Sequence, residues 1–256
     1  MRDRTRTRRR RRPAMTLAGL LAAVLTALLY RCSDTAATKT AAAPGSFDFY
    51  LLDVTHESAW CDDGNSQKGQ CRRLDRAAVD TRPLVLHGLW PEYQSPGSYP
   101  SNCAAQPLRL SSALRERLAE VMPGSLEGLD EHEWRKHGSC TGLDPETYFN
   151  ESIRLAERVN KSLVSTLRSA AGGSTSGAAL RASLASTDPE LADSMVFVCK
   201  NLRSVAPQYR RRPYLVSVRL CVDNDGPNGR PASLLNCTAV QRRDQGCGRS
   251  FFVDDL

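Results

Sequence analysis

Residues Glu131–Cys140 read EHEWRKHGSC, and the rest of the chain is organised around this stretch. Six consecutive positions within it contain two histidines, a glutamate and a lysine. Side chains three and four positions apart share one face of a helix, so a helix here would place Glu133 beside His137 and His132 beside Lys136. The segment is therefore predicted to form a helix that presents a base, an acid and a fixed positive charge together.

A zinc site is the main alternative interpretation of this segment, because a His-Glu pair followed by a second histidine also occurs on metalloprotease helices. Here His132 and His137 are five positions apart, which separates them by about 140° around a helix. Lys136 would also place an ammonium group where a dication binds, whereas zinc sites use neutral or anionic ligands. The sequence therefore predicts no metal and no other cofactor.

A second stretch, Leu84–Pro91, reads LVLHGLWP and is predicted to be a buried strand followed by a turn. His87 is expected where the strand ends, Gly88 in the turn, and Trp90 in the chain that leads away. A histidine in this position is held rigidly and stays accessible. Three of the four histidines lie in this stretch or in Glu131–Cys140, which indicates one shared site.

The motifs HGLWP (87–91) and HEWRKHGSC (132–140) resemble the two active-site signatures of the ribonuclease T2 family, whose members are secreted endoribonucleases with little base specificity. Weaker likeness extends from Phe47 to the C-terminus. It includes FDFYLLDV at its start, LAEVMPG after a predicted helix, and CGRSFFVDD at its end. The resemblance implies that the two motifs face each other across one groove.

The remaining elements predict a single α+β domain. Strands are expected at 47–55, 196–199 and 214–222, and helices at 111–122 and from 144 to about 167. Strands and helices do not alternate regularly, which favours a central antiparallel sheet flanked by helices, as in a ribonuclease T2-like fold. The glycine-rich segment 172–177 is interpreted as a connecting loop.

Cleaving RNA without a metal requires a base for the ribose 2′-OH, an acid for the departing 5′-oxygen, and cations near phosphorus. Imidazole suits the proton transfers because it titrates near neutral pH. The resemblance implies that His137 is the general base and His87 the general acid. It also implies that Lys136 and Glu133 support the transition state and that His132 binds phosphate. The expected product is a 2′,3′-cyclic phosphate, which is then opened to a 3′-phosphate.

Several of these residues also have structural interpretations. His87, taken alone, could be a strand-end histidine that is hydrogen-bonded to the backbone, and Glu133 with Lys136 could be a helical surface pair. Trp90 is a candidate surface for base stacking or a core residue. Trp134 is expected to lie in the core and anchor the helix.

The predicted partner is single-stranded RNA, cleaved by a monomer that does not cleave DNA and whose mature domain does not contact a membrane. One alternative function is a catalytically silent RNA-binding or inhibitory relative, which predicts that some of the candidate catalytic residues are replaced. All five are present: His87, His132, Glu133, Lys136 and His137. Another is a metal-dependent nuclease, which predicts a carboxylate-rich cluster near the histidines. Glu133 alone fits that description.

The N-terminal leader carries most of the net charge of +7. Residues 1–31 hold nine of the 35 basic residues and one of the 28 acidic residues, so the basic character says nothing about RNA binding by the rest. An arginine-rich region (1–13) precedes seventeen mostly apolar residues (14–30), which is typical of a secretory signal. A nucleic-acid-binding arginine run and an uncleaved membrane anchor are the alternatives.

The chain is therefore divided into a signal sequence (1–31), a linker and cleavage region (32–46), and a ribonuclease T2-like catalytic domain (47–256). The predicted location is outside the cell or in the periplasm. The alanine- and arginine-rich composition favours a bacterial source.

Cysteine usage fits an exported protein. Cleavage within the alanine-rich segment 36–43 would remove Cys32 and leave eight cysteines, an even number that indicates a disulfide framework. Arg31 stands where lipid modification of Cys32 would need a small residue, and no Cys-x-x-Cys pair suggests zinc. The resemblance implies the pairs Cys61–Cys71, Cys103–Cys140, Cys199–Cys247 and Cys221–Cys237.

The chain departs from the family pattern after the first strand. Many relatives carry a Ser-Trp pair where this sequence has Thr55 and His56. His56 is interpreted as a surface residue, and a position in the substrate groove is the alternative. The departure leaves base selection open.

Overall fold

The computed structural model describes residues 43–95, 97–103, 106–185, 187–203 and 211–255. The predicted signal sequence and residues 32–42 of the predicted linker lie outside these residues, so the division of the chain stays a prediction. Within the described ranges, no helix combines the length and the apolar character that crossing a bilayer requires.

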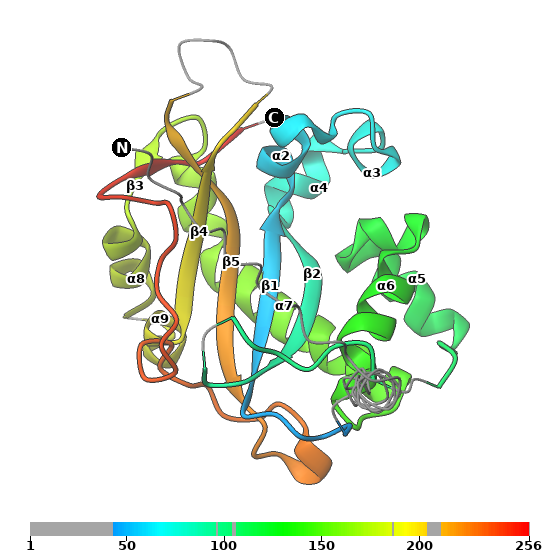
Figure 1. Ribbon diagram of the computed structural model, residues 1–256. Helices are drawn as coiled ribbons and strands as arrows, with labels where there is room; N and C mark the ends of the chain where they lie inside the picture. The colour runs from blue at the N-terminus through cyan, green and yellow to red at the C-terminus, as the bar shows by residue number, and fades with distance from the viewer. Residues whose placement is uncertain (1–42, 96, 104–105, 186, 204–210, 256) are drawn as a thin grey trace, which may run out of the picture. The chain divides into compact units, whose positions relative to one another are not determined.

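One sheet contains the six strands of the described residues (Figure 1). They are β1 (Phe49–His56), β2 (Leu84–Glu92), β3 (Ser174–Thr175), β4 (Met195–Asn201), β5 (Pro213–Asp223) and β6 (Phe251–Phe252). The strand order is β2-β1-β5-β6-β3, and β4 also pairs with β5. The pairs β1 with β2, β1 with β5 and β4 with β5 are antiparallel, whereas β6 lies parallel to β5. The predicted antiparallel arrangement is thus confirmed for the four long strands, and the sheet as a whole is mixed.

The two faces of the sheet have different roles because successive strand side chains point to opposite sides. In β1, Tyr50, Leu52 and Val54 belong to the main core. Helix α7 (Pro145–Ala170) packs on this face and crosses behind the strands in Figure 1. Phe49 and Leu51 belong to a smaller apolar cluster on the opposite face. That second face is where the polar residues of the site lie.

The longer predicted helices are present, with the caps that their sequences suggest. Helix α5 (Ser112–Val121) begins after Ser111, whose hydroxyl accepts a hydrogen bond from the Leu114 N–H. Helix α7 begins after Asp144, which accepts from the Thr147 N–H at 3.0 Å. A side-chain acceptor at the N-cap satisfies a backbone donor that the helix itself leaves unpaired.

The other helical elements are short and surround the sheet. They are α2 (Glu57–Trp60), η1 (Cys61–Asn65), α3 (Gly69–Arg72), α4 (Arg76–Thr81), η2 (Pro123–Glu127), α6 (Leu129–Lys136), η3 (Gly138–Cys140), α8 (Gly177–Ala185), α9 (Pro189–Asp193) and η4 (Pro227–Gly229).

Two local predictions were wrong. The segment 172–177 is not only a loop, because Ser174 and Thr175 form β3 and pair with β6. The helix predicted over Glu131–Cys140 ends at Lys136, and His137 is its C-cap before a turn of 3₁₀-helix. The strand was missed because its partner, β6, is distant in the sequence. The helix end was missed because a change from α-helix to 3₁₀-helix leaves little trace in the local sequence pattern.

Four disulfides cross-link the described part of the chain. They join Cys61 to Cys71, Cys103 to Cys140, Cys199 to Cys247, and Cys221 to Cys237, which are the pairs that the resemblance implies.

Candidate active site

His87 lies in the middle of β2, not at its end as predicted. The strand continues to Glu92, and the pairing with β1 shifts so that Asp53 pairs with Gly88 while Val54 pairs with Leu86. His87 is therefore the extra residue of a β-bulge. Bulges change the direction of a side chain and are common beside active sites.

The imidazole of His87 stands between two buried carboxylates. Its Nδ1 is 3.8 Å from Oδ1 of Asp53, and its Nε2 is 3.6 Å from Oε1 of Glu133. The His87 side chain is 42% exposed, whereas the carboxylate side chains are 3% and 2% exposed. A protonated ring in this position faces a negative charge at each nitrogen, while substrate can still reach it.

Helix α6 brings the second motif to the same place. Glu133 and Trp134 are buried, and the His137 N–H donates to the Glu133 carbonyl oxygen at 2.9 Å. Trp134 belongs to the core as predicted: its Nε1 donates to the Gln106 carbonyl oxygen, and its ring packs against Tyr148. This anchoring fixes how far α6 lies from β2.

His137 is buried beside two aromatic rings, and positively charged groups lie near it. It is 5% exposed, and its Nδ1 has no hydrogen-bond partner among the described residues. The Trp90 and Tyr99 rings lie 5.4 and 5.6 Å from its ring. Burial, and after it the positive charges of Lys136, His132 and His87, lowers the pKa of His137 to about 3. The ring is therefore neutral at ordinary pH and can accept a proton.

Glu133 connects the two motifs. Its Oε2 accepts a hydrogen bond from Trp90 Nε1 at 2.7 Å, and its Oε1 faces His87. Burial raises the pKa of Glu133, while His87, the Trp90 hydrogen bond, His132 and Lys136 act in the opposite direction. The carboxylate is thus desolvated and depends on its polar neighbours for its charge.

Gly88 makes this approach possible. A Cβ added at Gly88 would collide with Oε2 of Glu133 and would lie 2.6 Å from Nε1 of Trp90. Only a residue without a side chain leaves the Trp90–Glu133 hydrogen bond in place.

We therefore expect Gly88→Ala to lower kcat at least tenfold and to destabilise the fold by about 1–3 kcal/mol, the usual cost of overpacking. Steady-state kinetics and thermal unfolding measure the two effects. Gly173→Ala is the matched control, because its added Cβ would meet only the Ala170 carbonyl oxygen, at 3.2 Å. Unchanged kinetics in Gly88→Ala would contradict the tight approach described above.

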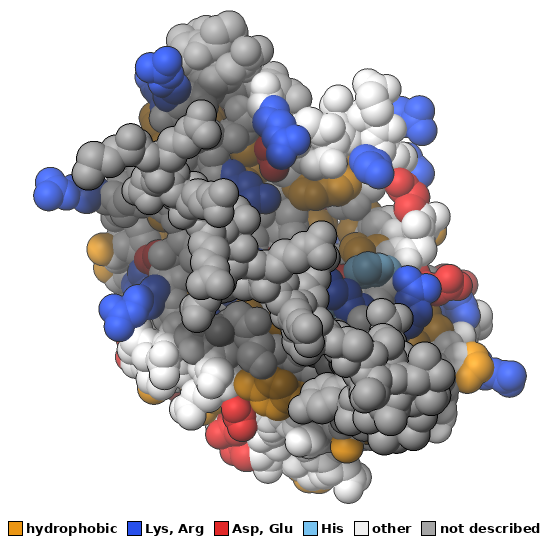
Figure 2. Space-filling view, in the orientation of Figure 1, with side chains coloured by type: hydrophobic (Ala, Val, Ile, Leu, Met, Phe, Trp, Pro, Cys, Tyr) orange, Lys and Arg blue, Asp and Glu red, His pale blue; other side chains and the backbone are white. Residues whose placement is uncertain are grey.

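Lys136 and His132 supply positive charge at the rim. Lys136 is half-buried, with Nζ 5.9 Å from the centre of the Tyr99 ring, and His132 is exposed. On the face opposite α7, Figure 2 shows a histidine with lysine or arginine side chains beside it. These charges can bind a phosphate without a metal. Within the described residues, no group of three or more His, Cys, Asp or Glu side chains is placed to hold a metal ion.

A disulfide and a backbone contact secure the end of this segment. Cys140 is bonded to Cys103, and the Asn102 N–H donates to the Lys136 carbonyl oxygen at 2.9 Å. The loop that follows HGLWP is thereby tied to the end of α6.

Sequence reasoning missed four residues that complete the site. Tyr99 is 41% exposed beside His137, and Asp53 receives hydrogen bonds from Ser217 and Arg219. The one available signal was Asp53, a carboxylate inside the apolar run FYLLDV. Its partners are more than 160 positions away along the chain, so no local pattern identifies them.

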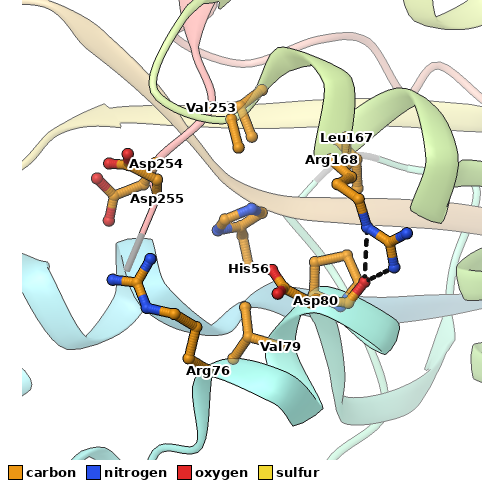
Figure 3. Close-up of a pocket in the computed structure, with 11 residues that line it drawn as sticks. His56, Arg76, Val79, Asp80, Leu167, Arg168, Val253, Asp254 and Asp255 are labelled. Atoms are coloured by element: carbon orange, nitrogen blue, oxygen red, sulfur yellow. Dashed lines mark hydrogen bonds between the residues drawn. The ribbon is translucent and has the colours of Figure 1, made fainter.

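His56 is not a surface residue, so that interpretation was wrong. It is 2% exposed and lies on the opposite face of β1 from Asp53 and Thr55, with Ser58 Oγ 3.1 Å from its Nδ1. It lines a separate pocket of about 240 Å³ formed by α4, the end of α7 and the C-terminal segment. Figure 3 shows its ring among the side chains that line this pocket. It therefore does not line the site that contains His87.

The buried His56 makes stability depend on pH. Burial lowers the pKa of His56 from 6.5 to about 4, so its contribution is complete above pH 6.5 and is lost as pH falls toward 4. Over this range the loss is expected to reach about 3 kcal/mol. Chemical unfolding of wild type and His56→Gln at several pH values measures it. The variant should show the smaller loss, and equal losses would contradict the assignment.

Comparison with known proteins agrees with this geometry. The model of the ribonuclease T2 family matches residues 47–233. Ribonuclease I of Escherichia coli is 25% identical over 245 residues, covering 82% of this chain and 87% of the relative. A ribonuclease of Aeromonas hydrophila is 32% identical, covering 44% of this chain and 47% of the relative. The chain thus spans about half the length of that second relative.

Solved structures show the same fold. A variant of ribonuclease MC1 in complex with 5′-UMP has a TM-score of 0.59 and 25% identity, covering 80% of this chain and 98% of that one. Ribonuclease NT in complex with 5′-AMP has a TM-score of 0.62 and 20% identity, covering 82% of this chain and all of that one. The chain belongs to the ribonuclease T2 family and is an endoribonuclease.

Proposed function

We propose that the protein cleaves single-stranded RNA, with little base specificity and without a metal, by attack of the ribose 2′-OH on the adjacent phosphorus. The observation that carries this proposal is the contrast between two histidines that both contact Trp90. The His137 ring is buried and neutral, whereas the His87 ring is accessible and lies between two carboxylates. A neutral base and an accessible second imidazole in one site are what a two-proton reaction needs.

In the first step, His137 removes the proton from the 2′-OH, and that oxygen forms a bond to phosphorus. The bond from phosphorus to the 5′-oxygen breaks, and His87 supplies the proton that this oxygen takes up. The products are a 2′,3′-cyclic phosphate and a free 5′-OH. In the slower second step the roles reverse. His87 deprotonates a water, whose oxygen forms a bond to phosphorus, while the bond from phosphorus to the 2′-oxygen breaks and that oxygen takes a proton from His137, giving the 3′-phosphate.

The cationic groups support the charge that develops on the phosphoryl oxygens. Lys136 projects from the last turn of α6, one residue before His137, and His132 lies one helical turn earlier. We assign Lys136 to the transition state and His132 to phosphate binding. Glu133 has an indirect role: it contacts His87 and Trp90, so it fixes the position of the acid.

Two aromatic residues support low base specificity, because base stacking does not depend on sequence. Trp90 is half-buried, with its indole N–H used by Glu133 and Arg219 over its ring. Tyr99 is more exposed and lies beside His137. We therefore assign the main stacking contact to Tyr99 and a supporting one to Trp90.

Cleavage of the four RNA homopolymers in excess chelator tests specificity and metal independence together. All four should be cleaved, with rates within about two orders of magnitude, because stacking contributes only about 1–3 kcal/mol per base. Tyr99→Ala should raise KM on each polymer. Restriction to one base, or loss of activity with chelator, would contradict the proposal. Binding of RNA without any cleavage would instead support the silent relative.

We also propose that the protein is exported. The arginine-rich region and the apolar segment that follows it are typical of a secretory signal, and four disulfides need an oxidising compartment to persist. The protein is proposed to act as a monomer outside the cytoplasm.

A further inference from the structure

Asp53 is a carboxylate in the middle of an apolar strand, and the reaction steps described above give it no role of its own. Its neighbours Leu52 and Val54 point into the main core, so Asp53 lies on the opposite face, under the bulge at His87. It is 2% exposed, and its Oδ1 is 3.8 Å from Nδ1 of His87. A buried carboxylate costs free energy unless it is paired, so its partners indicate what it does.

The orientation of this carboxylate is fixed by β5. Ser217 Oγ donates to Oδ1 at 2.7 Å, and Arg219 Nε donates to Oδ2 at 2.7 Å. In the sheet, Asp53 pairs with Arg219 and Thr55 pairs with Ser217, so both donors come from the strand beside β1. Hydrogen bonds of this kind compensate the cost of burying a carboxylate and fix its orientation. Oδ1 of Asp53 is thereby held facing His87.

The same network reaches the other side of His87. The Arg219 guanidinium lies 5.3 Å from the centre of the Trp90 ring, and Trp90 donates to Glu133. His87 is therefore flanked by Asp53 from β1 and Glu133 from α6. Arg219 of β5 forms an ion pair with Asp53. Lys136 and His132 of α6 also face this cluster, because both act electrostatically on Glu133 and on His137.

We infer that Asp53 is a positioning residue for the general acid His87. Its Oδ1 faces Nδ1 and would receive the Nδ1–H once this contact shortens, which leaves Nε2 as the nitrogen that carries the transferable proton. The 3.8 Å separation is longer than a hydrogen bond, and such contacts in empty sites often shorten when substrate binds. The inference rests on the proposed function, because it assigns Asp53 a task only if His87 is the acid.

The competing interpretation is that Asp53 only anchors Arg219 and the sheet. Asp53→Asn separates the two, because asparagine keeps the shape and can still accept from Arg219 but carries no charge. If Asp53 supports the acid, the alkaline limb of the pH profile of kcat/KM lies about one unit lower in Asp53→Asn than in wild type. Above that limb, kcat/KM of the variant is about tenfold lower. A purely structural role changes stability and leaves the limb in place.

A substrate with an activated leaving group provides a second readout. A uridine 3′-(4-nitrophenyl phosphate) releases a stable anion and needs little help from an acid. Asp53→Asn should turn over this substrate within about twofold of wild type while it is slowed about tenfold on a ribodinucleotide. Equal losses on both substrates, or an alkaline limb that does not move, would overturn the inference.

Glu92→Gln is the matched control. Glu92 is also a buried carboxylate on a strand of this sheet, paired with Arg242 at 2.8 Å, but it has no contact with His87. Glu92→Gln should lower the unfolding temperature and leave the alkaline limb of the pH profile in place. If Asp53→Asn does not fold, the double variant Asp53→Asn with Arg219→Gln also removes the guanidinium charge that has lost its carboxylate partner, and it is tested in the same way. Failure of the proposed function itself is distinguishable, because wild type would then form no cyclic phosphate.

Discussion

Replacing His137 with alanine is expected to lower kcat for RNA cleavage by about 10²–10⁴-fold, the usual contribution of one positioned proton acceptor. The ring is buried between Trp90 and Tyr99, so its loss also leaves a small space in the site. The affinity for 5′-UMP should stay within a few-fold of wild type, because Lys136 and His132 remain. Single-turnover kinetics and calorimetric titration measure the two quantities. Turnover like that of wild type would remove His137 from the mechanism.

The burial of His137 also predicts how activity depends on pH. Its pKa is lowered to about 3, so the base form is present at all higher pH values and is lost only as pH falls through 3. The acidic limb of kcat/KM is therefore expected near pH 3, provided that circular dichroism shows a folded protein there. A limb near pH 6.5, the ordinary value for histidine, would mean that a different group is the base.

Replacing His87 with glutamine is expected to lower kcat on a ribodinucleotide by a similar factor, about 10²–10⁴-fold. The loss should depend on the leaving group, which distinguishes the acid from the base. On uridine 3′-(4-nitrophenyl phosphate), which needs little protonation of its leaving group, His87→Gln should retain most of its activity.

His137→Ala is the matched comparison for that experiment, since the 2′-OH must lose its proton whatever group departs. It should be slow on both substrates. If His87→Gln is equally slow on both, the acid role given to His87 is wrong, and its position between Asp53 and Glu133 has another purpose.

The chemistry of the site could be predicted because it is local in sequence. Glu133, Lys136 and His137 lie within one and a half helical turns, and HGLWP is a single run, so residue type and spacing alone bring the groups together. The long strands and helices followed from apolar periodicity, and Ser111 and Asp144 marked two helix starts.

Features that depend on pairing between distant segments could not be predicted. The bulge at His87 arises from the register of β2 against β1, and the pattern of either strand alone does not show it. Asp53 and Arg219 meet only because β1 and β5 are neighbours in the sheet. His56 was misplaced because its burial also depends on distant segments. A polar residue at a strand end is usually exposed, but here α4, α7 and the C-terminal segment cover it.

The central claim is metal-independent attack by the ribose 2′-OH. The most direct measurement incubates the purified, oxidised protein in excess chelator with a ribodinucleotide and, separately, with its 2′-deoxy counterpart, and identifies the products by mass spectrometry. We expect a 2′,3′-cyclic phosphate from the ribodinucleotide and no reaction of the deoxy compound. Cleavage of the deoxy compound, or cleavage of the ribodinucleotide only when a metal is restored, would contradict it.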